Sequence, residues 1–210
     1  MSNKETKHMS NLSFRILALI HDNPIRSVFC DPYKLLRMAG LKHGQKVLEV
    51  GCGPGFFTMP AAKIVGEEGV VYAVDVHPLA IERVKEKIER EGMKNVKPML
   101  ANASDTGLPD QSIDLTFIFG LRYIAGGLGN VIAEIHRILK PGGVLSFEKT
   151  KSSAKKLIVE VERSGFVYSG RQASKDIPIY KGEMKPKIRE MKEMREENKK
   201  KKTKIGELLT

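Results

Sequence analysis

The segment that most constrains the fold is Val47–Thr58, VLEVGCGPGFFT, in which a short apolar run leads directly into three closely spaced glycines. The apolar run predicts a buried strand, and the residues after the glycines predict a helix. Glycine suits a backbone that turns sharply or approaches a ligand with no Cβ in the way. We therefore expect a strand, a ligand-binding loop and a helix, with the ligand beside Gly51, Cys52, Gly53 and Gly55.

Strand and helix patterns alternate along the central part of the chain. The strand-like runs are VVYAVD, NVKPML, IDLTFIF and VLSFEK, and the helical runs include PLAIERVKEKIERE, NVIAEIHRILK and SAKKLIVEVERS. Because strands that alternate with helices pair in parallel, we predict an α/β fold with a doubly wound, mostly parallel sheet. Pro141-Gly142-Gly143 is expected only to connect a helix to the fifth strand. The runs FVYSGRQ and DIPIYKG predict an antiparallel C-terminal strand pair.

The chain divides into three predicted parts. Residues 1–40 form a polar leader and two lid helices, of which the second begins at Asp31-Pro32 with a capping carboxylate and a proline at its first position. Residues 41–184 form the ligand-binding domain. Residues 185–210 form a charged tail with no evident core face; the stretch from Lys181 to Thr210 carries +5 of the total net charge of +11.

The glycine loop departs from the dinucleotide-binding pattern G-x-G-x-x-G, because Phe56 stands where the third glycine is required. Glu49 lies two residues before Gly51, and a carboxylate there suits an ammonium group better than a pyrophosphate. Asp75, twenty residues after Gly55, ends the second predicted strand, where a carboxylate accepts hydrogen bonds from ribose hydroxyls. S-adenosylmethionine carries an ammonium, a sulfonium and a ribose but no phosphate, so the sequence favours it over NAD.

Other candidate site residues also follow predicted strands. Val76 offers an apolar face to an adenine, and Asn102 and Ala103 offer an amide oxygen and a backbone N–H to its edge. In open α/β sheets, ligands bind at the carboxyl ends of the strands. We therefore expect these residues to share one site with the glycine loop. Cys52 is expected to be a small buried residue rather than a nucleophile.

Four segments between about Leu41 and Glu148 resemble those of the small class I S-adenosylmethionine-dependent methyltransferases: LKHGQKVLEVGCGPG, VYAVD, LPDQSIDLTF and EIHRILKPGGVL. They are most similar to the ubiquinone and menaquinone biosynthesis subgroup, of the methyltransferase type 11-like kind. The resemblance implies a Rossmann-like fold, S-adenosylmethionine as cofactor and methyl transfer as activity.

The same resemblance implies a role for each matching residue. Glu49, Gly51 and Gly53 would lie along the methionine part of the cofactor. Asp75 would hold the ribose and Val76 would pack on the adenine. The adenine edge would meet Asn102 and Ala103, although the family more often has Asp at the position of Asn102. Phe119, at the end of the fourth strand, would pass its backbone along the methionine part and the reacting methyl.

The sequence does not identify the methyl acceptor. Methyl transfer is an in-line displacement that needs orientation more than a dedicated base. IFGLRYIAG stands where amino methyltransferases of the N/D-P-P-Y/F type carry their motif, and the chain has no Pro-Cys pair to attack a pyrimidine. The candidate acid–base groups on the acceptor side are Arg122, Tyr123, His21 and Tyr33. We expect a small-molecule acceptor, covered by lid helices from residues 12 to 40.

Three alternatives stay open. The basic tail suggests an RNA-directed methyltransferase, and cofactor binding without turnover would make the chain a non-catalytic scaffold. Peripheral membrane contact is the third, through the apolar residues near Arg15 and Arg26, namely Leu12, Phe14, Ile16, Leu17 and Leu19. Only two cysteines and the lack of a signal-peptide pattern favour the cytoplasm. No metal site is predicted.

Overall fold

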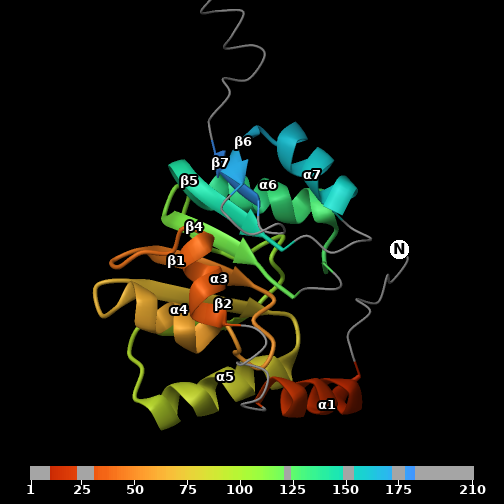
Figure 1. Ribbon diagram of the computed structural model, residues 1–210. Coiled ribbons are helices and arrows are strands. Elements are labelled where there is room, and N and C mark those ends of the chain that lie inside the picture. Colours follow the sequence, from red (N-terminus) through yellow and green to blue (C-terminus); the bar gives the residue numbers. More distant parts are fainter. Residues whose placement is uncertain (1–9, 23–30, 121–123, 149–153, 172–177, 183–210) are drawn as a thin grey trace, which may run out of the picture.

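The computed structural model describes residues 10–22, 31–120, 124–148, 154–171 and 178–182 (Figure 1). The helices are α1 (Asn11–Asp22), α3 (Pro32–Met38), α4 (Thr58–Val65), α5 (Pro78–Glu91), α6 (Leu128–Ile138) and α7 (Ala154–Arg163). The strands are β1 (Lys46–Val50), β2 (Val70–Asp75), β3 (Val96–Leu100), β4 (Ile113–Ile118), β5 (Leu139–Phe147), β6 (Phe166–Arg171) and β7 (Pro178–Gly182). The predicted tail and the candidates Arg26, Arg122 and Tyr123 lie outside the described residues.

The strands form one sheet in the order β3-β2-β1-β4-β5-β7-β6. The first five strands in this order pair in parallel, which confirms the predicted doubly wound sheet. β7 pairs antiparallel with β5, and β6 pairs antiparallel with β7. The strand order reverses between β1 and β4, so the connections that leave these two strands run to opposite faces. This topological switch point, at the carboxyl ends of the strands, is where ligands bind in such sheets.

Helices cover both faces of the sheet (Figure 1). α3, α4 and α5 lie on one face, where Val47, Leu115 and Phe117 belong to a single buried apolar cluster with side chains of these helices. α6 and α7 lie on the other face, over a second cluster that includes Leu48 and Ile118. Successive strand residues therefore enter opposite cores, because side chains alternate across a strand.

The N-terminus of α3 has the predicted cap. Asp31 accepts hydrogen bonds from the backbone N–H of Tyr33 at 2.9 Å and of Lys34 at 3.2 Å, and Pro32 occupies the first helical position. The side chain thus satisfies two donors that a helix start leaves unpaired.

The structure corrects the interpretation of Pro141-Gly142-Gly143. These residues lie inside β5, which begins directly after α6 at Leu139, rather than in a turn that precedes the strand. Ile113 of β4 pairs with Leu139, whereas Leu115 pairs with Val144. β5 therefore carries a bulge that contains the proline and both glycines, because such residues interrupt a ladder without ending the pairing on either side.

Helix α1 packs beside α5 through few side chains. Phe14 and Ala18 are buried, and the Phe14 ring stacks on His77 with centroids 4.6 Å apart and planes inclined by 17°. The other described apolar side chains of α1 are exposed, namely Leu12, Ile16, Leu19 and Ile20. A surface cavity of about 380 Å³ lies between the two helices. None of the described helices is long and apolar enough to cross a bilayer.

Candidate functional site

The glycine loop follows β1 in the chain and is hydrogen-bonded to the end of the neighbouring strand β2. The backbone N–H groups of Gly51 and Cys52 donate to the carbonyl of Val74 at 2.8 and 3.1 Å. Gly55 N–H donates to the carbonyl of Cys52 at 3.0 Å and closes the turn. Cys52 is buried, as expected, and burial raises the pKa of its thiol, so this residue is not poised as a thiolate nucleophile.

Two glycines of this loop serve different needs. Gly53 has φ +50°, which disfavours any residue with a Cβ, and a Cβ built there would meet no atom within 4 Å. The space beside Gly53 is therefore open to a ligand. Gly55 instead faces the protein, since a Cβ at that position would lie 3.2 Å from Val84 of α5. The second position allows the loop and helix to pack closely.

Glu49 is buried at the loop end of β1, with 3% of its surface exposed. The hydroxyl of Thr58, at the start of α4, donates to Glu49 Oε2 over 2.6 Å. Burial raises the pKa of Glu49 to about 8; nearby Asp75 acts in the same direction, whereas the Thr58 hydrogen bond and Lys87 act against it. This carboxyl group is costly to charge in the free protein, and a cationic ligand group would stabilise its ionised form.

Asp75 ends β2 and is held by backbone on both sides. Its Oδ2 accepts a hydrogen bond from Gly53 N–H, and its Oδ1 accepts one from His77 N–H, each at 2.9 Å. Each carboxylate oxygen can accept more than one hydrogen bond, so Asp75 retains acceptor capacity for a ligand. The side chain is thereby fixed in orientation beside the open space at Gly53. Val76, the next residue, is half-buried.

Asn102 and Ala103 lie in the turn after β3, beside Asp75. The N–H of Ala101 donates to the carbonyl of Asp75 at 3.1 Å, which ties this turn to the end of β2. The Asn102 amide oxygen accepts a hydrogen bond from Ser104 N–H at 3.1 Å, and Ala103 is buried. The Asn102 amide therefore also orders its own turn.

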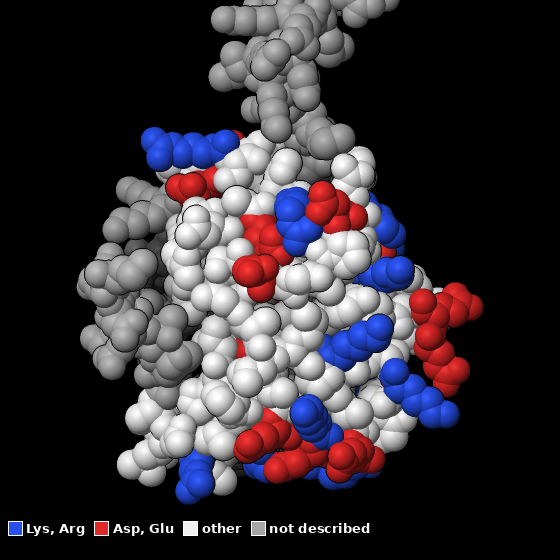
Figure 2. All heavy atoms as spheres, turned by 180° about the vertical axis from the view of Figure 1, so that it is seen from behind, with Lys and Arg blue, Asp and Glu red and all other residues white. Residues whose placement is uncertain are grey.

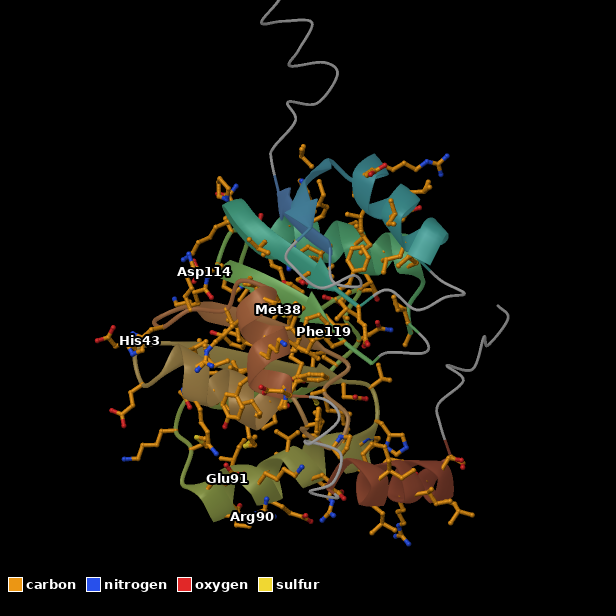
Figure 3. The ribbon with its side chains drawn as sticks, in the orientation of Figure 1. Met38, His43, Arg90, Glu91, Asp114 and Phe119 are labelled. Carbon is orange, nitrogen blue, oxygen red and sulfur yellow. The ribbon has the colours of Figure 1, made fainter. Side chains whose placement is uncertain are left out.

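Phe119 follows β4 directly, at the end of the strand opposite to Asp114 (Figure 3). Its side chain is buried against Phe57 and Phe117, with ring centroids 5.3 and 5.2 Å away. These three rings form an apolar wall below the carboxyl edge of the sheet. The structure thus brings the ends of β1, β2, β3 and β4, with all the predicted cofactor residues, to one edge.

Sequence reasoning missed several residues of this edge. Thr58 was not singled out, although it lies nine residues after Glu49 at the helix start, and Phe57 had only its place in the FF doublet as a signal. Glu148, at the end of β5, was also missed. Of the weak acid–base candidates, Tyr33 is half-buried on α3, and the side chain of His21 is not described.

The central part of the chain is similar to known methyltransferases. Residues 47–143 match the family model of a methyltransferase domain. The chain is 36% identical over 111 residues to a demethylmenaquinone methyltransferase of Geobacillus stearothermophilus. The matched region covers 52% of this chain and 47% of that protein. It is 32% identical over 105 residues to an aklanonic acid methyltransferase of Streptomyces, covering 50% and 47%. The chain spans about half the length of the curated relatives it matches.

Solved structures extend the likeness over most of the fold. A methyltransferase from Aquifex aeolicus, described as dependent on S-adenosylmethionine, superposes with a TM-score of 0.70 at 26% identity. The match covers 83% of this chain and 98% of that one. The sheet order, the family match and this likeness agree with the resemblance of the sequence. The chain therefore carries a domain that belongs to the class I S-adenosylmethionine-dependent methyltransferases.

Proposed function

We propose that this chain transfers the methyl group of S-adenosylmethionine to a small-molecule acceptor. One observation carries the proposal: the loop that follows buried Glu49 is hydrogen-bonded to Asp75, through Gly53 N–H and Asp75 Oδ2 at 2.9 Å. Two carboxylates on adjacent strands thereby flank one open stretch of backbone. An ammonium at one end and a ribose at the other are the groups that this pair suits.

The residues present fit the cofactor that the family implies. Glu49, Gly51 and Gly53 would hold its methionine part, with Cys52 and Gly55 shaping the loop. Asp75 would accept hydrogen bonds from the ribose, and Val76 would cover the adenine. The open space beside Gly53 and the remaining acceptor capacity of Asp75 support this assignment. Asn102 and Ala103 would bound the adenine edge, and Phe119 would bound the methyl.

The chemistry needs orientation above all. S-adenosylmethionine supplies a methyl group on a positively charged sulfur, which makes that methyl electrophilic. Glu49 and Asp75 would fix the position of the donor, and the rings of Phe57, Phe117 and Phe119 would exclude water from the end of β4. Holding the reactants in line is worth several powers of ten in rate by itself. A dedicated base is therefore optional for an acceptor that is already nucleophilic.

A small molecule is the acceptor we favour. The relatives are named for demethylmenaquinone and aklanonic acid, both small molecules. An RNA-directed enzyme would present a basic surface, yet Lys and Arg are interspersed with Asp and Glu on the face seen in Figure 2. The basic tail, which motivated the RNA alternative, lies outside the described residues. We also propose a cytoplasmic location and a lid role for residues 12–40. The antiparallel pair of β6 and β7 would complete the C-terminal side of the sheet.

Calorimetric titration with S-adenosylmethionine tests the cofactor assignment. We expect binding by the wild type and at least tenfold weaker binding by Asp75→Ala and by Gly53→Ala. Gly142→Ala is the matched control, because Gly142 also has positive φ, +75°, and open space around its Cβ position, but lies in the β5 bulge. Unchanged affinity in both site variants would refute the assignment.

A product assay separates an enzyme from a scaffold. The protein would be incubated with S-adenosylmethionine labelled in its methyl group and with hydroxylated, amine and thiol small molecules, and in parallel with total RNA. We expect label in the small-molecule fraction. Label in RNA alone would favour the RNA-directed alternative, and tight cofactor binding without any labelled product would favour the scaffold.

A further inference from the structure

The end of β5 brings a carboxylate to the site edge. Phe147, the last residue of β5, pairs with Ile118, the last residue of β4, and Glu148 N–H donates to the carbonyl of Ile118 at 3.0 Å. Glu148 is therefore the neighbour, across the strand ends, of the Phe119 backbone. β4 lies between β5 and the glycine loop of β1, so Glu148 stands on the far side of β4 from the donor residues.

The Glu148 side chain is oriented by backbone. Its Oε2 accepts a hydrogen bond from Gly120 N–H at 3.0 Å, while the residue as a whole is exposed. Gly120 is exposed as well, and a Cβ built on it would meet no atom within 4 Å. A fixed carboxylate thus borders open space immediately after Phe119.

Several other carboxylates among the described residues are paired with cations. Asp114 binds Lys140 at 2.6 Å, Glu134 binds Arg137 at 2.7 Å, and Glu91 binds Lys63 at 2.8 Å. Among the described residues, no Lys or Arg forms such a pair with Glu148. Its second oxygen is available to a hydrogen-bond donor that enters the space beside Gly120.

We propose that Glu148 is the acceptor-side carboxylate of this enzyme and that its acceptor carries an ionisable hydroxyl. The inference rests on the proposed methyl transfer and adds the acceptor class. The hydroxyl proton passes to Glu148 as the acceptor oxygen, or a ring carbon conjugated with it, forms a bond to the methyl carbon. The carbon–sulfur bond breaks, and its electron pair stays on sulfur, which becomes a neutral thioether. General-base assistance of this kind is worth about 10²- to 10⁴-fold in rate.

The test compares Glu148→Gln with the wild type on two probes, catechol and 4-nitrocatechol. Glutamine keeps an oxygen for Gly120 N–H but takes up no proton. We expect unchanged affinity for S-adenosylmethionine, and a fall in kcat of about 10²-fold or more with catechol. The loss should shrink to less than tenfold with 4-nitrocatechol, because its more acidic hydroxyl is already ionised near neutral pH. Glu67→Gln, an exposed glutamate in the loop before β2, is the control.

Several outcomes would overturn the inference. A Glu148→Gln variant as active as wild type on catechol would do so, and so would equal losses on both probes, which is what a purely structural role predicts. Methylation of amines or thiols but of no hydroxylated probe would refute the acceptor class and leave the proposed function intact. A wild type that fails to bind S-adenosylmethionine would instead refute the proposed function itself.

Discussion

The hydroxyl of Thr58, the first residue of α4, lies 2.6 Å from Oε2 of Glu49 in β1, so the hydrogen bond links the two elements on either side of the glycine loop. This contact couples the start of a helix to the one buried carboxyl group placed at the donor end of the site. The ionisation of the Glu49 carboxyl group is linked both to folding and to ligand binding, and each linkage leads to a measurable prediction.

Glu49 should make the free protein less stable as pH rises. Its pKa is raised from 4.5 to about 8 in the folded protein, so the folded state binds more protons than the unfolded state between these values. The stabilising contribution is complete below pH 4.5 and is lost as pH rises through about 8. Thermal unfolding from pH 5 to 9 should show this decline, and Glu49→Gln should reduce it. A parallel decline in the variant would contradict the assignment.

Cofactor binding should release a proton from Glu49. Near pH 7 a carboxyl group with a pKa of about 8 is mostly protonated, and an ammonium group placed beside it favours the charged form. Titrations with S-adenosylmethionine in phosphate and in Tris, whose ionisation enthalpies differ, should therefore give different heats. Divided by the difference in buffer ionisation enthalpy, the difference in binding enthalpy should correspond to nearly one proton released per site. It should disappear in Glu49→Gln. Equal heats in both buffers for the wild type would show that Glu49 does not meet the ammonium.

Gly126 should tolerate alanine poorly. A Cβ there would lie 2.5 Å from both Asn102 Oδ1 and Ser104 Oγ, and φ is +83°. Gly107→Ala is the control, since its φ of +67° is similar but its surroundings are open. We expect about 1 kcal/mol of destabilisation in the control and about 1–3 kcal/mol more in Gly126→Ala, by urea unfolding. Equal losses would show that the turn at Asn102 yields to the added methyl.

Arg137 should protect the protein from acid. It donates to both oxygens of the largely buried Glu134, which also accepts from Thr106, and these bonds lower the pKa of Glu134 to about 2. The stabilising contribution is present above pH 4.5 and is lost as pH falls toward about 2. Because the Arg137 side chain is partly exposed to solvent, Arg137→Ala should cost about 1–2 kcal/mol and move acid unfolding to higher pH, as followed by circular dichroism. Arg90→Ala, which breaks an exposed pair with Glu91, should cost less than about 1 kcal/mol.

Phe14 should be the residue that anchors α1. It is buried against His77, whereas Leu19 on the same helix is 71% exposed. Phe14→Ala should cost about 3 kcal/mol of docking free energy and speed hydrogen exchange throughout α1. Leu19→Ala should leave exchange within a factor of two of the wild type. Equal protection in both variants would mean that other contacts hold the helix.

The parallel order of the sheet could be predicted because its signals are local. A strand that runs into Gly51 and Gly53 and then into a helix leaves little choice of connection, and the repeated alternation fixes parallel pairing. The β5 bulge could not be predicted in the same way, since Pro141-Gly142-Gly143 is also a common turn sequence. Only the pairing of Leu139 with Ile113, distant along the chain, shows that the strand has already begun.

Side-chain contacts were harder to predict than strand ends. Asp75 and Glu49 stood out because their positions relative to the glycine loop carry chemical meaning. Thr58 and Glu148 act through partners brought close by folding, so their spacing in the sequence carried no comparable signal. In α1, apolar residues occur on more than one side of the helix, and the pattern alone did not show that Phe14 is buried while Leu12 and Ile16 are exposed.

The proposed donor residues and the proposed acceptor-side carboxylate come from different parts of the sequence. Except for Phe119, every residue proposed to hold the donor precedes Ser104, whereas Glu148 and the glycines that follow Phe119 belong to the later part of the chain. Gly126 is an exception to this division, because a side chain there would press on Asn102, whereas a side chain at Gly120 would meet no atom within 4 Å. Selection could thus alter the acceptor side around Glu148 and Gly120 while the earlier donor residues keep their sequence.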